Sequence, residues 1–173
     1  TCAPTECYND HVVRLFLLAS AVWGIVGMLI GMYAAAELTW PGLNLGISWL
    51  TFSHIRPDHT FGVIFAFGGS ALMGTCFYVV QRTTHARLAW GRLAGFVFWG
   101  WQLICVLAMT TMPFGITQSK EYAEPEWFVD ILIAIVWVSF GAVFFATLAR
   151  RRIRHFYVAN WYYGAFIIAV GLL

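Results

Sequence analysis

The chain has 173 residues, of which 61% are hydrophobic and only 10% are charged, and its formal net charge is +2. Too few polar residues remain to cover a water-soluble fold, so the composition excludes a soluble globular protein. The sequence predicts an all-α, polytopic membrane protein in which residues 1–173 form one transmembrane domain within the lipid bilayer. No nucleic-acid partner is expected.

Apolar segments of membrane-spanning length follow one another along the chain. The predicted spans are Val12–Ala36, Phe61–Val80, Leu93–Met112 and Phe128–Leu148. Each has about 20 residues or more, which a hydrocarbon core of roughly 30 Å requires at about 1.5 Å per residue. A fifth segment, Trp161–Leu173, would reach only about 20 Å. Because this span is unfinished and the first residue is not methionine, we expect a piece of a longer polypeptide.

Basic residues divide unequally between the two ends of these spans. If the spans alternate in direction, only Arg56 and Lys120 fall on one face, and all the other basic residues fall on the opposite face. The residues of that opposite face are Arg14, Arg82, Arg87, Arg92, Arg150, Arg151, Arg152 and Arg154. By the positive-inside rule this face is cytoplasmic, which predicts a multi-pass protein with a cytoplasmic N-terminus.

The outer face is predicted to be acidic. Its carboxylates are Glu37, Asp58, Glu121, Glu124, Glu126 and Asp130. The longest connection, Trp40–Pro57, opens with a Pro-Gly turn and continues with apolar residues, so we expect it to lie along the outer membrane interface.

The interiors of the predicted spans carry no ionised side chain. Such a group at the bilayer centre costs about 3 kcal/mol or more, so a transporter or pump with its working carboxylate in this segment is disfavoured. The neutral polar residues are expected to hydrogen-bond between helices or to their own turn. They are Thr75, Gln102, Thr110, Ser139 and Thr147. The cysteines, Cys2, Cys7, Cys76 and Cys105, have no spacing typical of haem attachment or zinc binding.

His59 is the histidine whose position suggests a metal ligand. It follows Arg56, Pro57 and Asp58 at the head of the second predicted span. Pro57 has a φ suited to the first turn of a helix and Asp58 can cap it, so the helix is predicted to start there. The imidazole would then point inward from the first turn.

Small side chains follow His59 at helical spacing. This strip consists of Gly62, Ala66, Gly69, Ser70, Met73 and Gly74. A flat porphyrin could lie along such a strip, but another helix could approach it equally well, as the Gly27-to-Gly31 spacing of the first span also allows. A hydrogen-bonded polar histidine without a metal is the third interpretation.

A six-coordinate haem would need a second axial ligand from elsewhere. His54 is joined to His59 by a short, proline-stiffened link, and His11, His85 and His155 are predicted to lie at the other membrane face. This segment therefore cannot supply both ligands. If His59 binds a haem, the second ligand comes from further sequence or another chain.

Several stretches resemble the catalytic subunit of cbb3-type cytochrome c oxidases, the C family of haem–copper oxidases. They are Arg56–Thr60, Val63–Gly69, Val79–Thr83, Lys120–Glu124 and Asn160–Trp161, and the resemblance runs over nearly the whole chain. It implies the N-terminal part of a twelve-helix subunit in the bacterial inner membrane. It also implies that His59 is an axial ligand of the low-spin haem b near the periplasmic side and that Arg56 lies near the haem propionates.

The same resemblance assigns a role to the acidic loop. It implies that Glu121 binds a calcium ion bridged to the propionates, with Glu124 as its companion, and carboxylate oxygens suit calcium. A solvated acidic loop is the alternative. The chain departs from the family pattern at Asp58 and at Phe61–Gly62, and an ionised carboxylate beside a haem would lower its potential.

The resemblance implies a terminal oxidase that passes electrons from cytochrome c through low-spin haem b to an oxygen-reducing centre, with coupled proton translocation. High-spin haem b and copper are ligated by later helices, so no catalytic residue is expected here, and this segment alone should be inactive. The implied partners are the remaining helices of the subunit, membrane-anchored monohaem and dihaem cytochrome c subunits, and cytochrome c.

Three other functions remain open from the sequence. The large subunit of cytochrome c-dependent nitric oxide reductase has the same kind of bis-histidine site. A non-enzymatic haem-binding or assembly protein of four to five helices would fit a short chain. A structural membrane subunit would fit if no haem is bound.

Overall fold

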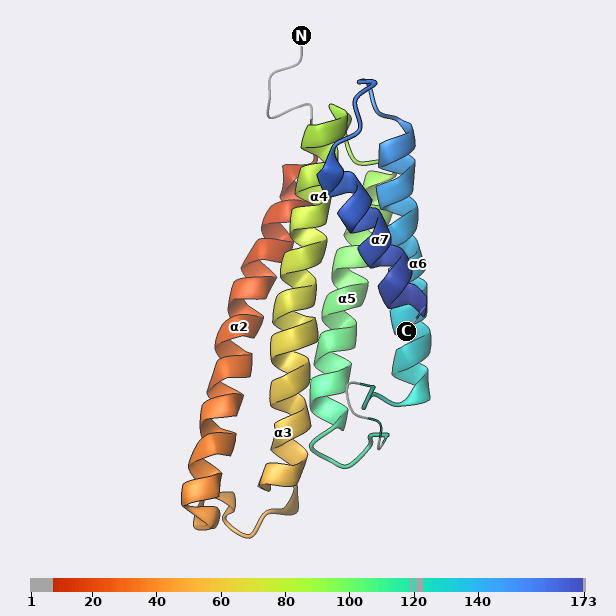
Figure 1. The fold of residues 1–173 in the computed structure, drawn as a ribbon. Coiled ribbons are helices and arrows are strands. Elements are labelled where there is room, and N and C mark those ends of the chain that lie inside the picture. Colours follow the sequence, from red (N-terminus) through yellow and green to blue (C-terminus); the bar gives the residue numbers. More distant parts are fainter. Residues whose placement is uncertain (1–7, 119, 121–122, 173) are drawn as a thin grey trace. The chain divides into compact units, whose positions relative to one another are not determined.

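The computed structural model describes residues 8–118, 120 and 123–172, and every regular element in these ranges is helical. In chain order the elements are α2 (Asp10–Thr39), η1 (Pro41–Asn44), η2 (Ser48–Leu50), α3 (Phe52–Phe61), η3 (Gly62–Gly69), α4 (Ser70–Thr84), α5 (Gly91–Thr111), α6 (Trp127–Ala149) and α7 (Val158–Leu172), as Figure 1 shows. The elements η1 and η2 are 3-10 turns, whereas η3 is a π-helix. The predicted all-α class is confirmed.

Four helical stretches are long and apolar enough to cross a membrane: α2, the continuous run Phe52–Thr84, α5 and α6. The run Phe52–Thr84 joins α3, η3 and α4 and has 33 residues. Helix α7 is apolar but has only 15 residues. The predicted pattern of four full spans and a short fifth is confirmed by length and composition.

The second span starts earlier than predicted. Helix α3 begins at Phe52, so Pro57 lies inside it and His59 lies in its last turn. The prediction that Pro57 and Asp58 start the helix at His59 is therefore wrong. The physical reason is a turn before the proline: the amides of His54 and Ile55 donate to the Thr51 carbonyl and start the helix there. The proline then costs the helix only one backbone hydrogen bond.

The predicted role of the neutral polar residues in the spans is confirmed. The Gln102 side chain accepts a hydrogen bond from the Trp23 indole of another helix at 2.7 Å. The other hydroxyls donate to carbonyls of their own turn, over distances of 2.6 to 2.8 Å; they are Thr75, Thr110, Ser139 and Thr147. Of the cysteines, Cys76 and Cys105 are buried free thiols.

The chain divides into two compact units, and the first is built on phenylalanine packing. Unit 1 comprises Thr1–Leu18, Ala71–Trp101 and Ile133–Leu173. Its largest fully buried side chains include Phe16, Phe77, Phe140 and Phe144. The ring centroids of Phe16 and Phe77 lie 6.0 Å apart, and those of Phe77 and Phe140 lie 5.3 Å apart. These rings join residues of α2, α4 and α6.

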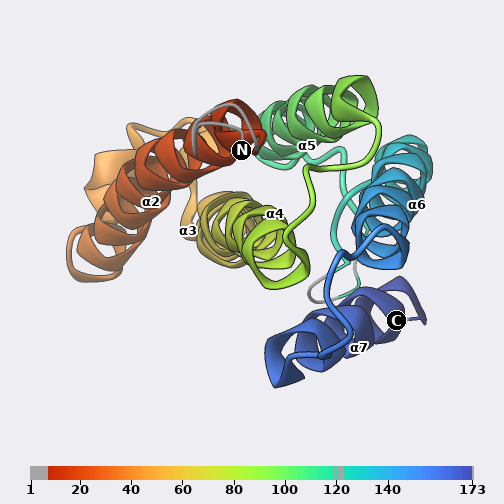
Figure 2. The same ribbon diagram turned by 90° about the horizontal axis from the view of Figure 1, so that it is seen from above.

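Helices of unit 1 approach one another closely at two glycines. A Cβ added at Gly74 would lie 2.8 Å from the Cβ of Phe16, and one added at Gly100 would lie 2.6 Å from Cγ2 of Val136. Helix α7 lies beside α6 (Figure 2), and the Trp137 indole donates to the Ile167 carbonyl at 2.9 Å. The short α7 is thus attached through a polar contact as well as apolar packing.

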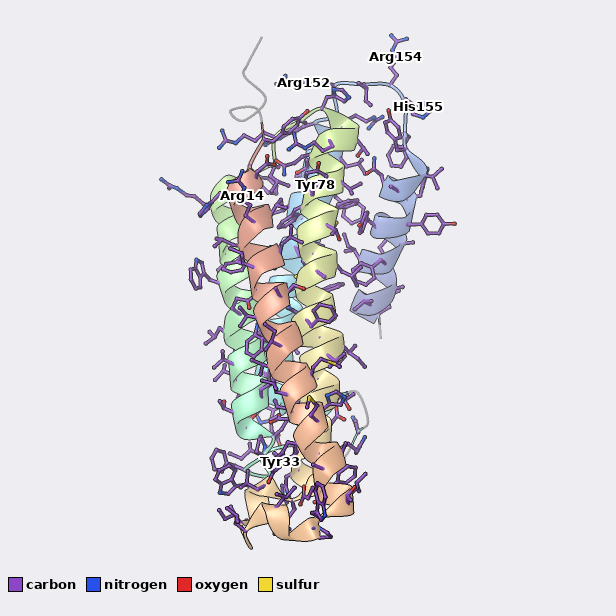
Figure 3. All side chains as sticks on the ribbon, turned by 90° about the vertical axis from the view of Figure 1, so that its left-hand side faces the viewer. Arg14, Tyr33, Tyr78, Arg152, Arg154 and His155 are labelled. Carbon is purple, nitrogen blue, oxygen red and sulfur yellow. The ribbon has the colours of Figure 1, made fainter. Side chains whose placement is uncertain are left out.

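One end of unit 1 is basic. The eight arginines that the sequence places on one membrane face all belong to this unit. Arg152, Arg154 and His155 lie at the same end as Arg14 and Tyr78 (Figure 3). At this end Arg82 pairs with Asp10 at 2.8 Å.

Unit 2 comprises Ala19–Ser70 and Gln102–Leu132 and contains His59. In it the Tyr33 hydroxyl of α2 donates to the Leu43 carbonyl at 3.2 Å, which ties the connection after α2 back to that helix. Large apolar side chains of α2 remain exposed; they include Val22, Ile25, Met28, Leu29 and Met32. We expect lipid or further helices to cover this surface.

Candidate functional site

The His59 side chain lies against α2. Its Nδ1 is 2.8 Å from the carbonyl oxygen of Gly27. One turn further along α2, a Cβ added at Gly31 would lie only 2.5 Å from Nδ1 and 3.0 Å from Nε2 of the same ring. The imidazole therefore occupies space that any side chain at position 31 would fill.

The contact with Gly27 determines the tautomer of the neutral His59 ring. A carbonyl oxygen only accepts, so Nδ1 must carry the proton and donate it. Nε2 is then the unprotonated nitrogen, with its lone pair available to a metal. Among the hydrogen bonds between described residues, none involves Nε2, and the residue is half-exposed. This arrangement fits a haem ligand that binds iron through Nε2.

A π-helix follows directly after His59. The element η3 spans Gly62–Gly69, and the Ser20 hydroxyl of α2 donates to the Phe67 carbonyl within it at 3.1 Å. π-helical turns are rare and often occur at functional sites, because the extra residue changes which side chains share a face. The sequence analysis missed this element.

The strip of mostly small residues that follows His59 is closely packed in the structure. The sequence left open whether a porphyrin or another helix would lie against this strip. Gly62, Ala66, Ser70, Met73 and Gly74 are buried, whereas Gly69 is half-buried. A Cβ at Gly62 would lie 3.1 Å from Cε of Met109 and 3.3 Å from Cα of Gly27. Protein atoms therefore fill the space at Gly62, so helix packing is what the structure shows at this position of the strip.

Glycines on one face of α2 make this close approach possible. A Cβ at Gly27 would lie 3.2 Å from the backbone carbon of Gly62, and one at Gly24 would lie 3.1 Å from the Phe67 ring. The sequence indicated the Gly27-to-Gly31 spacing as a helix contact, which is confirmed. It did not indicate that the partner is the His59 ring itself.

Arg56 lies on α3 one turn before His59, and its side chain is exposed. Residues three apart on a helix share a face, so the guanidinium and the imidazole are on neighbouring positions of α3. That Arg56 lies near the haem propionates stays a prediction, and the structure gives only its position one turn before His59.

Three buried carboxyl groups of unit 2 each have one oxygen without a hydrogen-bond partner among the described residues, and one of these groups belongs to the predicted acidic loop. Glu121 lies outside the described residues. Glu124 is buried, and its Oε1 has no hydrogen-bond partner among the described residues. The same holds for one oxygen of Asp58 and one of Glu37. The backbone of the loop is fixed by the Gln118 amide, which donates to the Glu124 carbonyl at 2.7 Å.

No group of three or more His, Cys, Asp or Glu side chains within the described ranges could hold a metal ion. The solvated-loop alternative does not fit Glu124, which is 5% exposed. Sequence reasoning placed these acids on the outer face but could not foresee their burial, because burial depends on how the loop packs.

The other histidines differ from His59. In unit 2, the only other histidine is His54, whose Nδ1 is 2.8 Å from the Thr51 hydroxyl. His11, His85 and His155 belong to unit 1 and are exposed. Unit 2 thus offers His59 as a candidate ligand and does not bring a second histidine to its free nitrogen.

Comparison with known proteins gives matches over nearly the whole chain. The family described as "Cytochrome C and Quinol oxidase polypeptide I" matches residues 11–173. The chain is 53% identical over 171 residues to the cbb3-type cytochrome c oxidase subunit CcoN1 of Stutzerimonas stutzeri, a match that covers 99% of this chain and 36% of that protein.

Two further relatives agree with this result. The chain is 49% identical to a cytochrome c oxidase subunit 1 homolog of Agrobacterium tumefaciens, over 99% of this chain and 32% of that protein. It is 50% identical to cytochrome c oxidase subunit 1 of Rhodobacter capsulatus, over 96% of this chain and 32% of the relative. The chain thus spans about a third of the length of these relatives.

Proposed function

We propose that this chain, which belongs to the Cytochrome C and Quinol oxidase polypeptide I family, is the N-terminal part of the haem-bearing subunit of a cbb3-type respiratory oxidase. Its role in that subunit is to hold low-spin haem b through His59. The observation that carries the proposal is the hydrogen bond from His59 Nδ1 to the Gly27 carbonyl, because it presents Nε2 as the ligand atom.

Different residues of unit 2 would have different roles in such a haem site. A bound low-spin haem supplies a one-electron carrier between cytochrome c and the oxygen-reducing centre. His59 would hold the iron through Nε2, and Arg56, one turn away on α3, would offset the negative charge of the propionates. The Gly27 carbonyl would hold the proton on Nδ1 and so keep Nε2 as the ligand atom.

The rest of the reaction belongs to other parts of the complex. The second ligand of the low-spin haem, the high-spin haem b and the copper site are assigned to the remaining helices of the same subunit. Membrane-anchored monohaem and dihaem cytochrome c subunits and cytochrome c are the proposed electron donors, in a bacterial inner membrane. Proton translocation is coupled to the oxygen chemistry of that complete subunit.

The choice between oxygen and nitric oxide as substrate is tested on the purified complex. With reduced cytochrome c as donor, we expect oxygen consumption that cyanide abolishes, because a haem–copper centre binds this anion. Reduction of nitric oxide without oxygen consumption would favour the nitric oxide reductase. A complex without any haem would leave only a structural subunit.

The basic end of unit 1 predicts the orientation in the membrane. The arginine asymmetry places Arg150–Asn160 in the cytoplasm and Thr117–Glu126 in the periplasm. Single cysteines introduced into the second loop should react with an impermeant maleimide added from outside, whereas cysteines in the first should not. The reverse pattern would put His59 near the cytoplasmic face and contradict the proposal.

We also propose that the acidic loop binds a calcium ion through Glu121. We expect Glu121→Gln to lower the calcium content of the complex and to shift the low-spin haem potential, because the ion offsets propionate charge. Glu126→Gln removes the same charge from the same loop and serves as the control. Equal calcium content in both variants and the wild type would leave Glu121 without a metal role.

A further inference from the structure

We propose that Gly31 and the Gly27 carbonyl form a seat on α2 that orients the His59 imidazole and fixes its Nε2-ligating tautomer. This proposal rests on haem ligation by His59, as proposed above. It assigns a positioning role to Gly31, which acts on the candidate ligand through the space that the His59 ring occupies.

The first step is the space that the ring requires. A Cβ at position 31 would lie 2.5 Å from Nδ1 of His59, closer than real Cβ atoms come to other heavy atoms, and 3.0 Å from Nε2, at the tight end of real contacts. An alanine at position 31 must therefore displace the imidazole, or α2 must move away from α3.

The second step is that the ring cannot move freely. Its Nδ1 is held at 2.8 Å from the Gly27 carbonyl. The backbone next to it is also fixed, because the Cα of Gly27 packs against Gly62, three residues after His59. A shift of the ring by the distance that a methyl group needs would lengthen or break the Nδ1 hydrogen bond.

The third step connects this bond to the haem. A carbonyl that accepts from Nδ1–H increases the basicity of the imidazole and fixes its plane relative to the metal. A more basic ligand stabilises ferric iron, so the bond lowers the midpoint potential of the haem. Loss of the hydrogen bond between His59 Nδ1 and the Gly27 carbonyl should therefore raise the midpoint potential of the haem and change the orientation of the imidazole plane.

Gly24 provides a matched control on the same helix. The three atoms nearest to a Cβ there all belong to the Phe67 ring, the closest at 3.1 Å, and that side chain is 42% exposed and can turn away. Gly24→Ala thus adds the same methyl group to the same face of α2 without touching His59.

The experiment compares the complete complex carrying Gly31→Ala, Gly24→Ala or His59→Ala with the wild type. The readouts are the midpoint potential of the low-spin haem, its electron paramagnetic resonance g values and its haem content. For Gly31→Ala we expect a positive shift in potential, altered g values and a haem affinity lower by about 10- to 100-fold. Gly24→Ala should match the wild type in all three.

Two results would contradict the proposal that Gly31 and the Gly27 carbonyl orient the His59 imidazole. One is a Gly31→Ala complex with wild-type potential and g values, and the other is an equal shift in Gly24→Ala, which would indicate general overpacking. Loss of ligation is separate: if His59→Ala retains the low-spin signal, then His59 is not the ligand and the proposed function fails.

If the complex with Gly31→Ala does not assemble, the hydrogen bond between His59 Nδ1 and the Gly27 carbonyl can be tested in the wild-type complex. In the reduced, diamagnetic haem, solid-state NMR of protein labelled with ¹⁵N-histidine and [1-¹³C]glycine should detect one close pair between an imidazole Nδ1 and a glycine carbonyl carbon. Such a pair is expected because the Nδ1-to-oxygen distance is 2.8 Å. Absence of the coupling in the wild type would contradict the seat.

Discussion

The complete complex with His59→Ala should lose the whole absorption and paramagnetic signal of its low-spin haem. A six-coordinate low-spin iron needs both axial ligands, and in unit 2 the Nε2 of His59 has no substitute, because the other histidine, His54, lies five positions earlier on α3 and so on a different face of that helix. Oxygen consumption with reduced cytochrome c should fall to background, since electrons can no longer pass through this haem. Spectra of the purified variant and an oxygen electrode measure both effects.

His54→Ala is the matched control for this variant. It removes the same side chain type five positions earlier, where the imidazole bonds only to neighbours in its own turn. The low-spin spectrum and turnover of His54→Ala should be close to those of the wild type. A His59→Ala complex that keeps its low-spin signal would refute ligation by this residue.

The helices were predictable because they depend on local sequence. Long runs of apolar residues must satisfy their backbone hydrogen bonds internally in a bilayer, so the length and composition of α2, α5 and α6 suffice to predict them. The start of α3 was missed because Pro57 is locally a helix-starting residue. The actual start follows Thr51, whose carbonyl accepts from the amides of His54 and Ile55; threonine is a favoured N-cap residue, but the Pro57 signal was given more weight.

The candidate site was predictable only in part for the same reason. The sequence puts His59 at the second span with Arg56 three residues before it, but it was not predicted that His59 lies in the last turn of α3 rather than at a helix start. Its seat at Gly27 and Gly31 requires knowing which face of α2 meets α3, over 32 residues of separation for the His59–Gly27 bond. The π-helix η3 likewise depends on contacts with α2, such as the bond from Ser20.

The largest effect on stability is expected at Gln81 in unit 1. Its side chain is fully buried, and its Oε1 accepts from the amides of Asn9 at 2.7 Å and Leu88 at 3.3 Å. Its Nε2 donates to the Phe77 carbonyl at 3.0 Å. One side chain thus makes hydrogen bonds to backbone groups of three segments: the residue before α2, helix α4 and the turn between α4 and α5.

Gln81→Leu keeps the size of the side chain but leaves two backbone amides without their acceptor. A buried donor without a partner costs about 1–3 kcal/mol, so we expect a loss of about that size in unfolding free energy from the buried Leu88 amide and a smaller loss from the part-buried Asn9 amide. Thr110→Val is the control, because that hydroxyl is exposed and bonds only within its own turn, so its effect should stay within about 0.5 kcal/mol. Denaturant unfolding of the detergent-solubilised complex measures both variants. If Gln81→Leu unfolds at the wild-type midpoint, other partners satisfy the Asn9 and Leu88 amides, and Gln81 does not hold this end of unit 1 together.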